Sequence, residues 1–224
     1  DFNLPSRKAY IYSVDNLISS DLAINRTTKH LDIAIGTGRR AIRIRELSGL
    51  NYEIVGVEIS EEMCKIANSR GLRTYHQDWA NNDSHTGEMF DSATFLYAFG
   101  HIADRKNRAK SLKKINSYLK EESPFYIDLF SLNNNNEWGP LTLKAFQENN
   151  LGKHGYEKGD VFYKKRGFSE FAFLHYFEFN EIKSLLADTG FRIEWVKYIG
   201  YSKNPGQIVD SEREGNFLIK AIKI

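Results

Sequence analysis

The chain alternates between short apolar runs and stretches in which apolar residues recur every three or four positions. The short runs predict buried strands at residues 31–35, 51–58, 72–75, 92–98 and 124–130. The helical spacing predicts helices at residues 6–24, from the glycines after the first run to about 48, from Ser60 to just before Gly71, and at 105–119. Alternating strands and helices predict a parallel sheet with helices on both faces.

The pattern changes in the second half of the chain. Periodicity is lost from Ser131 to Asp160, which predicts a mobile loop or a lid. The next segment, VFYKKRGFSEFAFLHYFEF, predicts two aromatic strands around a turn at Arg166-Gly167. A helix capped by Asn180 and ended by Gly190 then precedes two last strands, FRIEWVKYIG and NFLIKAIKI.

Composition narrows the class of protein. A chain of 224 residues with 41% hydrophobic residues suits one globular domain. Its 31 basic and 29 acidic side chains lack the basic excess that is typical of nucleic-acid binding. Cys64 is the only cysteine, which excludes an intrachain disulfide and fits a reducing compartment. We expect a cytoplasmic monomer or homodimer without nucleic-acid or membrane partners.

The segment LDIAIGTGRRAIRI, residues 31–44, carries the clearest motif. It predicts a buried strand, a Gly-Thr-Gly turn at 36–38 and a helix start. Glycines permit the turn and let a ligand approach the helix N-terminus closely. The same residues satisfy the G-x-G-x-x-G/A pattern of dinucleotide-binding folds, with Glu58 where a ribose-binding acid is expected. The turn alone therefore leaves two classes of cofactor open.

Three further features favour one of these classes. Asp32 lies inside the first strand, four residues before Gly36, and Asp78 follows the third strand. A Tyr-x-x-x-Lys pair, which short-chain dehydrogenases need, is absent from the sequence. The run from Asp32 to Asp78 resembles class I S-adenosylmethionine-dependent methyltransferases. It departs from their D-x-G-x-G-x-G pattern at Ala34, where the family has its first glycine.

The resemblance implies a Rossmann-like α/β fold, with a seven-stranded, mostly parallel sheet and an antiparallel C-terminal strand. Within one domain over residues 1–224, residues 1–29 would form a helical cap, and the loop and aromatic hairpin of residues 131–178 would form a lid. The cofactor would be S-adenosylmethionine, leaving as S-adenosylhomocysteine. The implied cofactor-binding residues are Asp32, Gly36, Thr37, Gly38, Arg39, Glu58, Ile59, Asp78, Trp79 and Tyr97.

Several of these residues have structural alternatives. Asp32 would face the cofactor ammonium, and Glu58 would accept hydrogen bonds from both ribose hydroxyls, unless it is simply a solvated acid at a strand end. Asp78 would lie beside adenine, or it only forms a turn. Trp79 would stack near adenine or pack under its loop.

The prediction for the acceptor-binding side of the site depends on the segment YAFGHI after the fourth predicted strand. It resembles small-molecule N-methyltransferases acting on amino sugars and glycine, which have a Gly-His or Ala-His pair there. His101 would then take a proton from the attacking group, or it merely starts the next helix. Aromatic residues could form an acceptor cage that attracts a cationic amine, or belong to the core; they are Tyr10, Tyr12, Tyr97, Trp138 and the hairpin 162–179.

We therefore expect a methyltransferase acting on a small molecule, with transfer to nitrogen favoured over transfer to oxygen. Two alternatives remain. An RNA methyltransferase would use the basic stretches 39–45, 105–114 and 164–166, although the first two are typical of solvated helix faces. A cofactor-binding protein without catalysis would explain Ala34 and the unmatched acceptor region. No metal is required by this chemistry.

Overall fold

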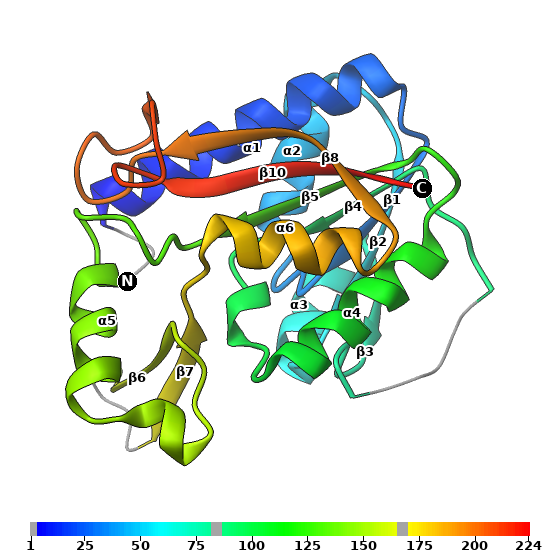
Figure 1. Ribbon diagram of the computed structural model, residues 1–224. Coiled ribbons are helices and arrows are strands. Elements are labelled where there is room, and N and C mark those ends of the chain that lie inside the picture. The colour runs from blue at the N-terminus through cyan, green and yellow to red at the C-terminus, as the bar shows by residue number, and fades with distance from the viewer. Residues whose placement is uncertain (1–3, 82–86, 165–169) are drawn as a thin grey trace.

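The computed structural model describes residues 4–81, 87–164 and 170–224; the turn expected at Arg166-Gly167 lies outside them. The central sheet contains β1 (Lys29–Ile33), β2 (Glu53–Glu58), β3 (Arg73–His76), β4 (Ser92–Phe95), β5 (Pro124–Leu129), β8 (Phe191–Ile199), β9 (Ile208–Val209) and β10 (Asn216–Lys223). Its strand order is β3-β2-β1-β4-β5-β10-β8-β9 (Figure 1). The first five strands pair in parallel, and β10 is antiparallel to both β5 and β8.

This arrangement confirms the Rossmann-like fold that the sequence implies. The sheet has eight strands where seven were expected, because β9 adds a two-residue pairing to the edge of β8. A strand of two residues is too short to produce an alternating pattern. The antiparallel C-terminal strand lies where the prediction placed it.

Helices cover both faces of the sheet. They are α1 (Pro5–Asn25), α2 (Arg39–Ser48), α3 (Glu61–Ser69), α4 (Arg105–Tyr118) and α6 (Phe179–Ala187), whereas α5 (Gly139–Glu148) lies apart from the sheet (Figure 1). One buried cluster joins α1, α2 and α3 to the sheet, and the other joins α4 and α6 to its opposite face (Figure 1). None of the helices in the described parts of the chain is long and apolar enough to cross a membrane.

Helix ends follow local chemistry in most places. Ser60 caps α3 by accepting a hydrogen bond from the Met63 N–H at 3.4 Å, as expected. The cap predicted at Asn180 is wrong, because α6 already begins at Phe179 after Glu178, which forms no side-chain cap. Gly190 adopts a positive φ of 84° just past this helix, which is the usual glycine termination.

Residues 131–164 and 170–178 lie beyond the carboxyl ends of the parallel strands (Figure 1). They contain α5, a short 3-10 helix η2 (Leu151–His154), and the hairpin of β6 (Asp160–Lys164) and β7 (Phe171–His175), which forms a separate two-stranded sheet. The sequence pattern missed α5 because this helix buries only Gly139 and Thr142, so it has no apolar stripe.

Candidate active site

The parallel strands β1, β2, β4 and β5 all end at one edge of the sheet, where ligands of open α/β folds bind. The glycine turn follows β1, and Glu58 is the last residue of β2. Tyr97 follows β4 and Phe130 follows β5 at this same edge. Residues that the sequence separates by almost a hundred positions are thus brought to one edge.

The glycine turn has the backbone geometry that the motif predicts. Gly36 and Gly38 adopt positive φ values of 58° and 76°. A Cβ on Gly36 would find only the Met63 sulfur, at 3.9 Å, so the loop surface is open there. A Cβ on Gly38 would collide with Leu72, so this glycine is needed for packing. Ala34, where the family has glycine, also adopts a positive φ, of 60°, at a cost of roughly 1–2 kcal/mol.

Glu58 is connected to this turn by hydrogen bonds. Its side chain is buried, with 6% exposure, and its Oε2 accepts from the Gly36 N–H at 2.9 Å. Its Oε1 accepts from the Ser60 N–H at 3.0 Å. Glu58 is therefore not a solvated strand-end acid. Each carboxylate oxygen has a second lone pair, so the group can hold the turn and still accept from a ligand hydroxyl.

Asp32 is a buried carboxyl group with a single strong partner among the described residues. The Thr94 hydroxyl donates to its Oδ1 at 2.8 Å. Burial raises the pKa of Asp32 to about 7, although the Thr94 hydrogen bond and the Arg40 charge oppose this. A cation placed beside Asp32 would stabilise its charged form, so the site suits a ligand ammonium.

Arg40 is a residue that the sequence analysis missed. Its Nε donates to Asp15 Oδ1 at 2.6 Å, whereas its buried Nη2 has no hydrogen-bond partner and lies 3.7 Å from Asp128 Oδ2. Arg43 pairs with the other oxygen of Asp15. The sequence analysis assigned these arginines to a solvated helix face. Asp15 could have indicated otherwise, because an acid within the apolar stripe of the first helix needs a buried basic partner.

The remaining residues of the turn have different surroundings. Arg39 is the exposed first residue of α2. Thr37 is half-buried, and its carbonyl accepts a hydrogen bond from Arg70. Ile59 directly follows Glu58 and is 63% exposed, although it is a large apolar residue. Its side chain is therefore available to cover a flat ligand group.

Asp78 makes the contacts of a turn-forming residue, and Trp79 makes those of a core residue. Asp78 Oδ1 accepts from the backbone N–H groups of Ala80 and Asn81, at 3.0 and 3.3 Å, which is a turn-forming arrangement. Trp79 is buried in the core, and its indole donates to the Ser111 carbonyl at 3.3 Å. In this conformation both side chains stabilise the loop after β3.

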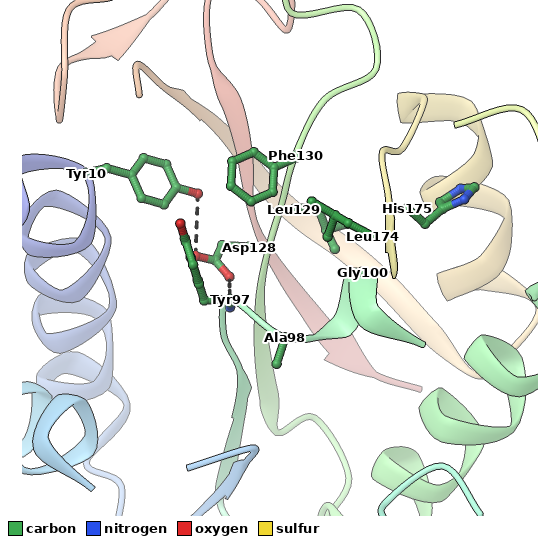
Figure 2. A pocket seen from close by; sticks show the side chains of 9 residues that line it. All are labelled: Tyr10, Tyr97, Ala98, Gly100, Asp128, Leu129, Phe130, Leu174 and His175. Atoms are coloured by element: carbon green, nitrogen blue, oxygen red, sulfur yellow. Dashed lines mark hydrogen bonds between the residues drawn. The ribbon is translucent and has the colours of Figure 1, made fainter. Parts of the chain in front are cut away.

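Two cavities lie beside the ends of β4 and β5. The larger, of about 220 Å³, is lined by the predicted acceptor-side residues Tyr97, His101 and Trp138 and by Tyr163 and Tyr176 of the predicted hairpin segment. The smaller has room for about one water molecule, and Figure 2 shows Tyr10 and the Tyr97 backbone directed at Asp128 in its wall. Tyr12 belongs to neither cavity; it is exposed and lies under the Arg43 guanidinium.

His101 lies in a short 3-10 helix, η1 (Phe99–His101), between β4 and α4. Its Nδ1 lies 2.6 Å from the Phe173 carbonyl, and a carbonyl can only accept, so Nδ1 carries the proton. The neutral ring therefore has its lone pair on Nε2. Gly100 is needed beside it, because a Cβ there would be 2.8 Å from the Leu174 side chain of β7.

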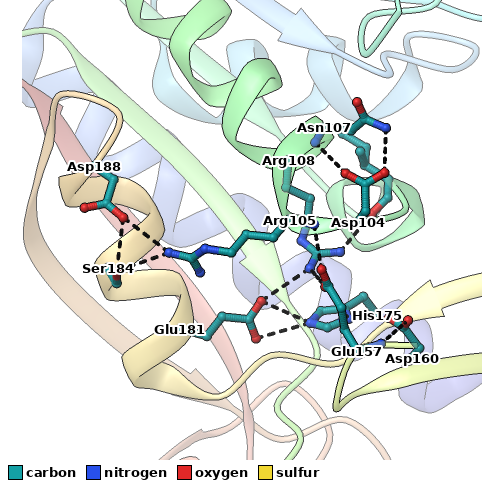
Figure 3. A network of polar contacts seen from close by, with 11 residues as sticks. Asp104, Arg105, Asn107, Arg108, Glu157, Asp160, His175, Glu181, Ser184 and Asp188 are labelled. Atoms are coloured by element: carbon teal, nitrogen blue, oxygen red, sulfur yellow. Dashed lines mark hydrogen bonds and ion pairs between the residues drawn. The ribbon is translucent and has the colours of Figure 1, made fainter. Parts of the chain in front are cut away.

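A polar network connects the hairpin to the body of the domain (Figure 3). His175 of β7 bonds Asp160 at 2.7 Å and Glu181 of α6 at 3.2 Å. Arg108 of α4 is fully buried and pairs with both Glu157 and Glu181. Burial opposes the charged form of His175, but the hydrogen bonds to Asp160 and Glu181 prevail and raise its pKa.

Three ligand-type atoms of this network, from Glu157, His175 and Glu181, lie within 4.8 Å of one another. Such a group could hold a metal ion in principle. However, the Arg108 guanidinium already contacts both carboxylates and supplies the positive charge. We therefore assign the network to anchoring the hairpin.

Comparison with known proteins gives the class of the fold. Residues 31–122 match the family model described as a methyltransferase domain. Comparison with curated proteins by sequence gives no match. Similar solved structures include a SAM-dependent methyltransferase from Methanosarcina mazei, with 21% identity over 88% of this chain and 92% of that chain and a TM-score of 0.66.

Two further structures have named acceptors or acceptor types. One is the 1,6-didemethyltoxoflavin-N1-methyltransferase of Burkholderia thailandensis, at 16% identity over 94% of this chain and 78% of that chain, with a TM-score of 0.61. The other is a sugar N-methyltransferase from Streptoalloteichus sp., at 17% identity over 93% and 87% of the two chains, with a TM-score of 0.61. At such identities the structures establish the fold alone. With the domain match, they support an enzyme that uses S-adenosylmethionine.

Proposed function

We propose that the protein transfers a methyl group from S-adenosylmethionine to a nitrogen atom of a small molecule. The observation that carries this proposal is that the glycine turn with Glu58 and the 220 Å³ cavity with His101 lie at the same edge of the sheet. A polar connection also runs from α2, which follows the turn, to the cavity wall: Arg40 approaches Asp128, and Asp128 accepts from the backbone of Tyr97.

The residues of the turn fit the cofactor chemically. Asp32 would hold its ammonium, and the orphaned Arg40 Nη2 would take its carboxylate. Glu58 would accept from the ribose hydroxyls, and the exposed Ile59 would cover adenine. When bound, the cofactor supplies an activated methyl group on a sulfonium, so the protein needs to orient the acceptor and exclude water.

His101 would remove a proton from the acceptor amine at its Nε2, since its Nδ1 already carries one. The amine lone pair then forms the new nitrogen–carbon bond, and the electron pair of the broken carbon–sulfur bond stays on sulfur. The Phe173 carbonyl would stabilise the protonated imidazole by accepting from Nδ1 throughout.

The basic stretches 39–45 and 105–114 give little support to an RNA acceptor, and most of the stretch 164–166 lies outside the described residues. Arg40 and Arg43 are paired with Asp15, and Arg108 is buried against two carboxylates. Side chains engaged in this way contribute little to neutralising a phosphate backbone. A small acceptor in the 220 Å³ cavity is the better supported choice.

The direct test follows a labelled methyl group from S-adenosylmethionine onto a panel of small amines and alcohols, with an unstructured RNA added in parallel. We expect label on amines above the rate without enzyme. Label on RNA alone, or on alcohols alone, would contradict the proposal. Tight cofactor binding without transfer to any acceptor would instead indicate the non-catalytic alternative.

A further inference from the structure

The wall of the 220 Å³ cavity consists mainly of aromatic rings. Six are present among the lining residues, namely Tyr97, Phe130, Trp138, Tyr163, Tyr176 and Tyr201. They come from segments far apart in sequence, after β4, after β5, from the hairpin and from the segment after β8. Such a wall binds flat or apolar groups by burying their surface against the rings, and the ring faces attract cations.

Four of the six rings contact one another, with Phe130 at their centre. Phe130 contacts Tyr97, Tyr176 and Tyr201, with ring centroids 5.7, 5.5 and 5.4 Å away. The Tyr97 and Tyr201 hydroxyls share a hydrogen bond of 2.7 Å. A wall that is already held together costs less entropy when a ligand binds.

Among the lining residues in the described parts of the chain, Glu137 is the only one with an acidic side chain. Its Oε1 accepts from the Ser202 N–H at 2.8 Å, which fixes the carboxylate between the segment after β5 and the segment after β8. One oxygen is thus occupied by the protein, while the carboxylate retains acceptor capacity for a ligand. A carboxylate among aromatic rings is well suited to bind an ammonium group.

The other charged residue of the wall is already engaged. Arg7 Nε donates to the Tyr97 hydroxyl at 2.9 Å, and its guanidinium lies 4.9 Å from the centre of that ring. The hydroxyls of Tyr97 and Tyr201 are likewise committed to each other. These polar groups are therefore already engaged within the protein, so most of the wall that a ligand meets is aromatic surface, which suits a flat apolar body better than a sugar.

From this wall we infer that the acceptor is a primary amine on an aromatic or similarly flat apolar body, with its ammonium bound by Glu137. This inference rests on the proposed function, and it names the substrate class of the same site. Glu137 would be the residue that selects an amine over an alcohol, and the rings would select a flat body over a sugar. His101, in the same wall, would take the proton that the ammonium must lose before attack.

The test measures binding rather than turnover. Isothermal titration at pH 7 with saturating S-adenosylhomocysteine would compare 2-phenylethylamine, 2-phenylethanol and glucosamine. We expect the aromatic amine to bind at least about tenfold more tightly than the alcohol and the amino sugar. Glucosamine binding as tightly as the aromatic amine, or an alcohol binding equally well, would overturn the inference.

Two variants separate the contributions of charge and ring. Glu137→Gln keeps an oxygen for the Ser202 N–H and should abolish the preference for amine over alcohol, whereas the control Glu148→Gln, on the exposed face of α5, should keep it. Tyr163→Leu should weaken the amine and the alcohol alike. A preserved preference in Glu137→Gln would refute the role of this carboxylate. If Glu137→Gln shows no cooperative melting transition, Glu137→Asp replaces it. We then expect an intermediate preference for amine over alcohol. An unchanged preference would contradict the role of the Glu137 carboxylate.

Failure of the inference can be told apart from failure of the proposed function. If S-adenosylhomocysteine does not bind, the proposed function fails, and the three acceptor probes are then compared on the cofactor-free protein. If S-adenosylhomocysteine binds but the aromatic amine shows no preference, only the inference about the acceptor fails.

Discussion

The Arg40 guanidinium of α2 lies 3.7 Å from the Asp128 carboxylate at the end of β5. This contact joins the helix that follows the glycine turn to the wall of the acceptor cavity, because Asp128 also accepts from the Tyr97 N–H and the Tyr10 hydroxyl (Figure 2). The two halves of the proposed site thus share one buried polar connection. Each half can still be tested separately.

Glu58 should determine cofactor affinity. Glu58→Gln removes the charge that strengthens hydrogen bonds from ribose hydroxyls, so we expect binding of S-adenosylhomocysteine to weaken by about 1.5 to 3 kcal/mol. Titration calorimetry gives this value directly. The matched control is Glu61→Gln, an exposed acid in the first turn of α3, which should leave affinity unchanged. Equal affinities in the two variants would remove Glu58 from the cofactor site.

Asp32 should destabilise the cofactor-free protein at neutral pH. Burial raises its pKa from 3.8 to about 7, so the folded state holds a proton that the unfolded state loses. The contribution of Asp32 to the free energy of unfolding therefore falls as pH rises from about 4 to about 7, and it is constant above that range. We expect Asp32→Asn to raise the Tm over wild type by an amount that grows between pH 5 and 7 and then levels off.

Two comparisons complete this prediction. Asp210 is exposed, so the Tm difference between Asp210→Asn and wild type should not change across the same pH range. Asp32→Asn should also bind S-adenosylhomocysteine less tightly at pH 8, because an amide cannot pair with the cofactor ammonium. A Tm difference that is independent of pH would show that Asp32 has an ordinary pKa.

The hairpin anchor should weaken at alkaline pH. Asp160 and Glu181 raise the pKa of His175 despite burial, and Glu157 and Arg108 are the other charged groups facing it. Its stabilising contribution is complete below about pH 6.5 and is lost as pH rises through the folded-state pKa. We expect His175→Gln to lower the Tm at pH 6 more than at pH 9. An equal loss at both values would contradict a charged His175.

His101 should affect turnover and not cofactor binding. Asn at this position can still donate to the Phe173 carbonyl, so His101→Asn removes the base while keeping the anchor. We expect kcat to fall by roughly two to four orders of magnitude, with S-adenosylhomocysteine affinity unchanged. If the mutant keeps full activity from pH 6 to 9, His101 has only a structural role at the end of η1.

The sequence alone was sufficient for the strands other than β9, for the glycine turn and for the place of Glu58. These depend on local patterns, since strand runs, helix spacing and a Gly-Thr-Gly turn are each encoded within about fifteen residues. Helix α5 was not predictable, because it makes few buried contacts and has no apolar stripe. The segment was therefore expected to be a loop.

The candidate site was predictable only in part. Arg40 looked like one of several solvated arginines, and only the folded structure brings it against Asp15 and Asp128. The acceptor wall combines Arg7, Glu137 and Tyr201, whose association depends on how distant segments pack. Asp78 and Trp79 had two possible roles each, and their contacts are those of a turn and of the core.

The most direct test of the central claim is the choice of cofactor, since the glycine turn by itself fits two classes of ligand. We predict that S-adenosylhomocysteine raises the Tm of the purified protein in a concentration-dependent way by mass action, whereas NAD and NADP leave it unchanged. Stabilisation by NAD or NADP, with no response to S-adenosylhomocysteine, would contradict the assignment of this site to methyl transfer.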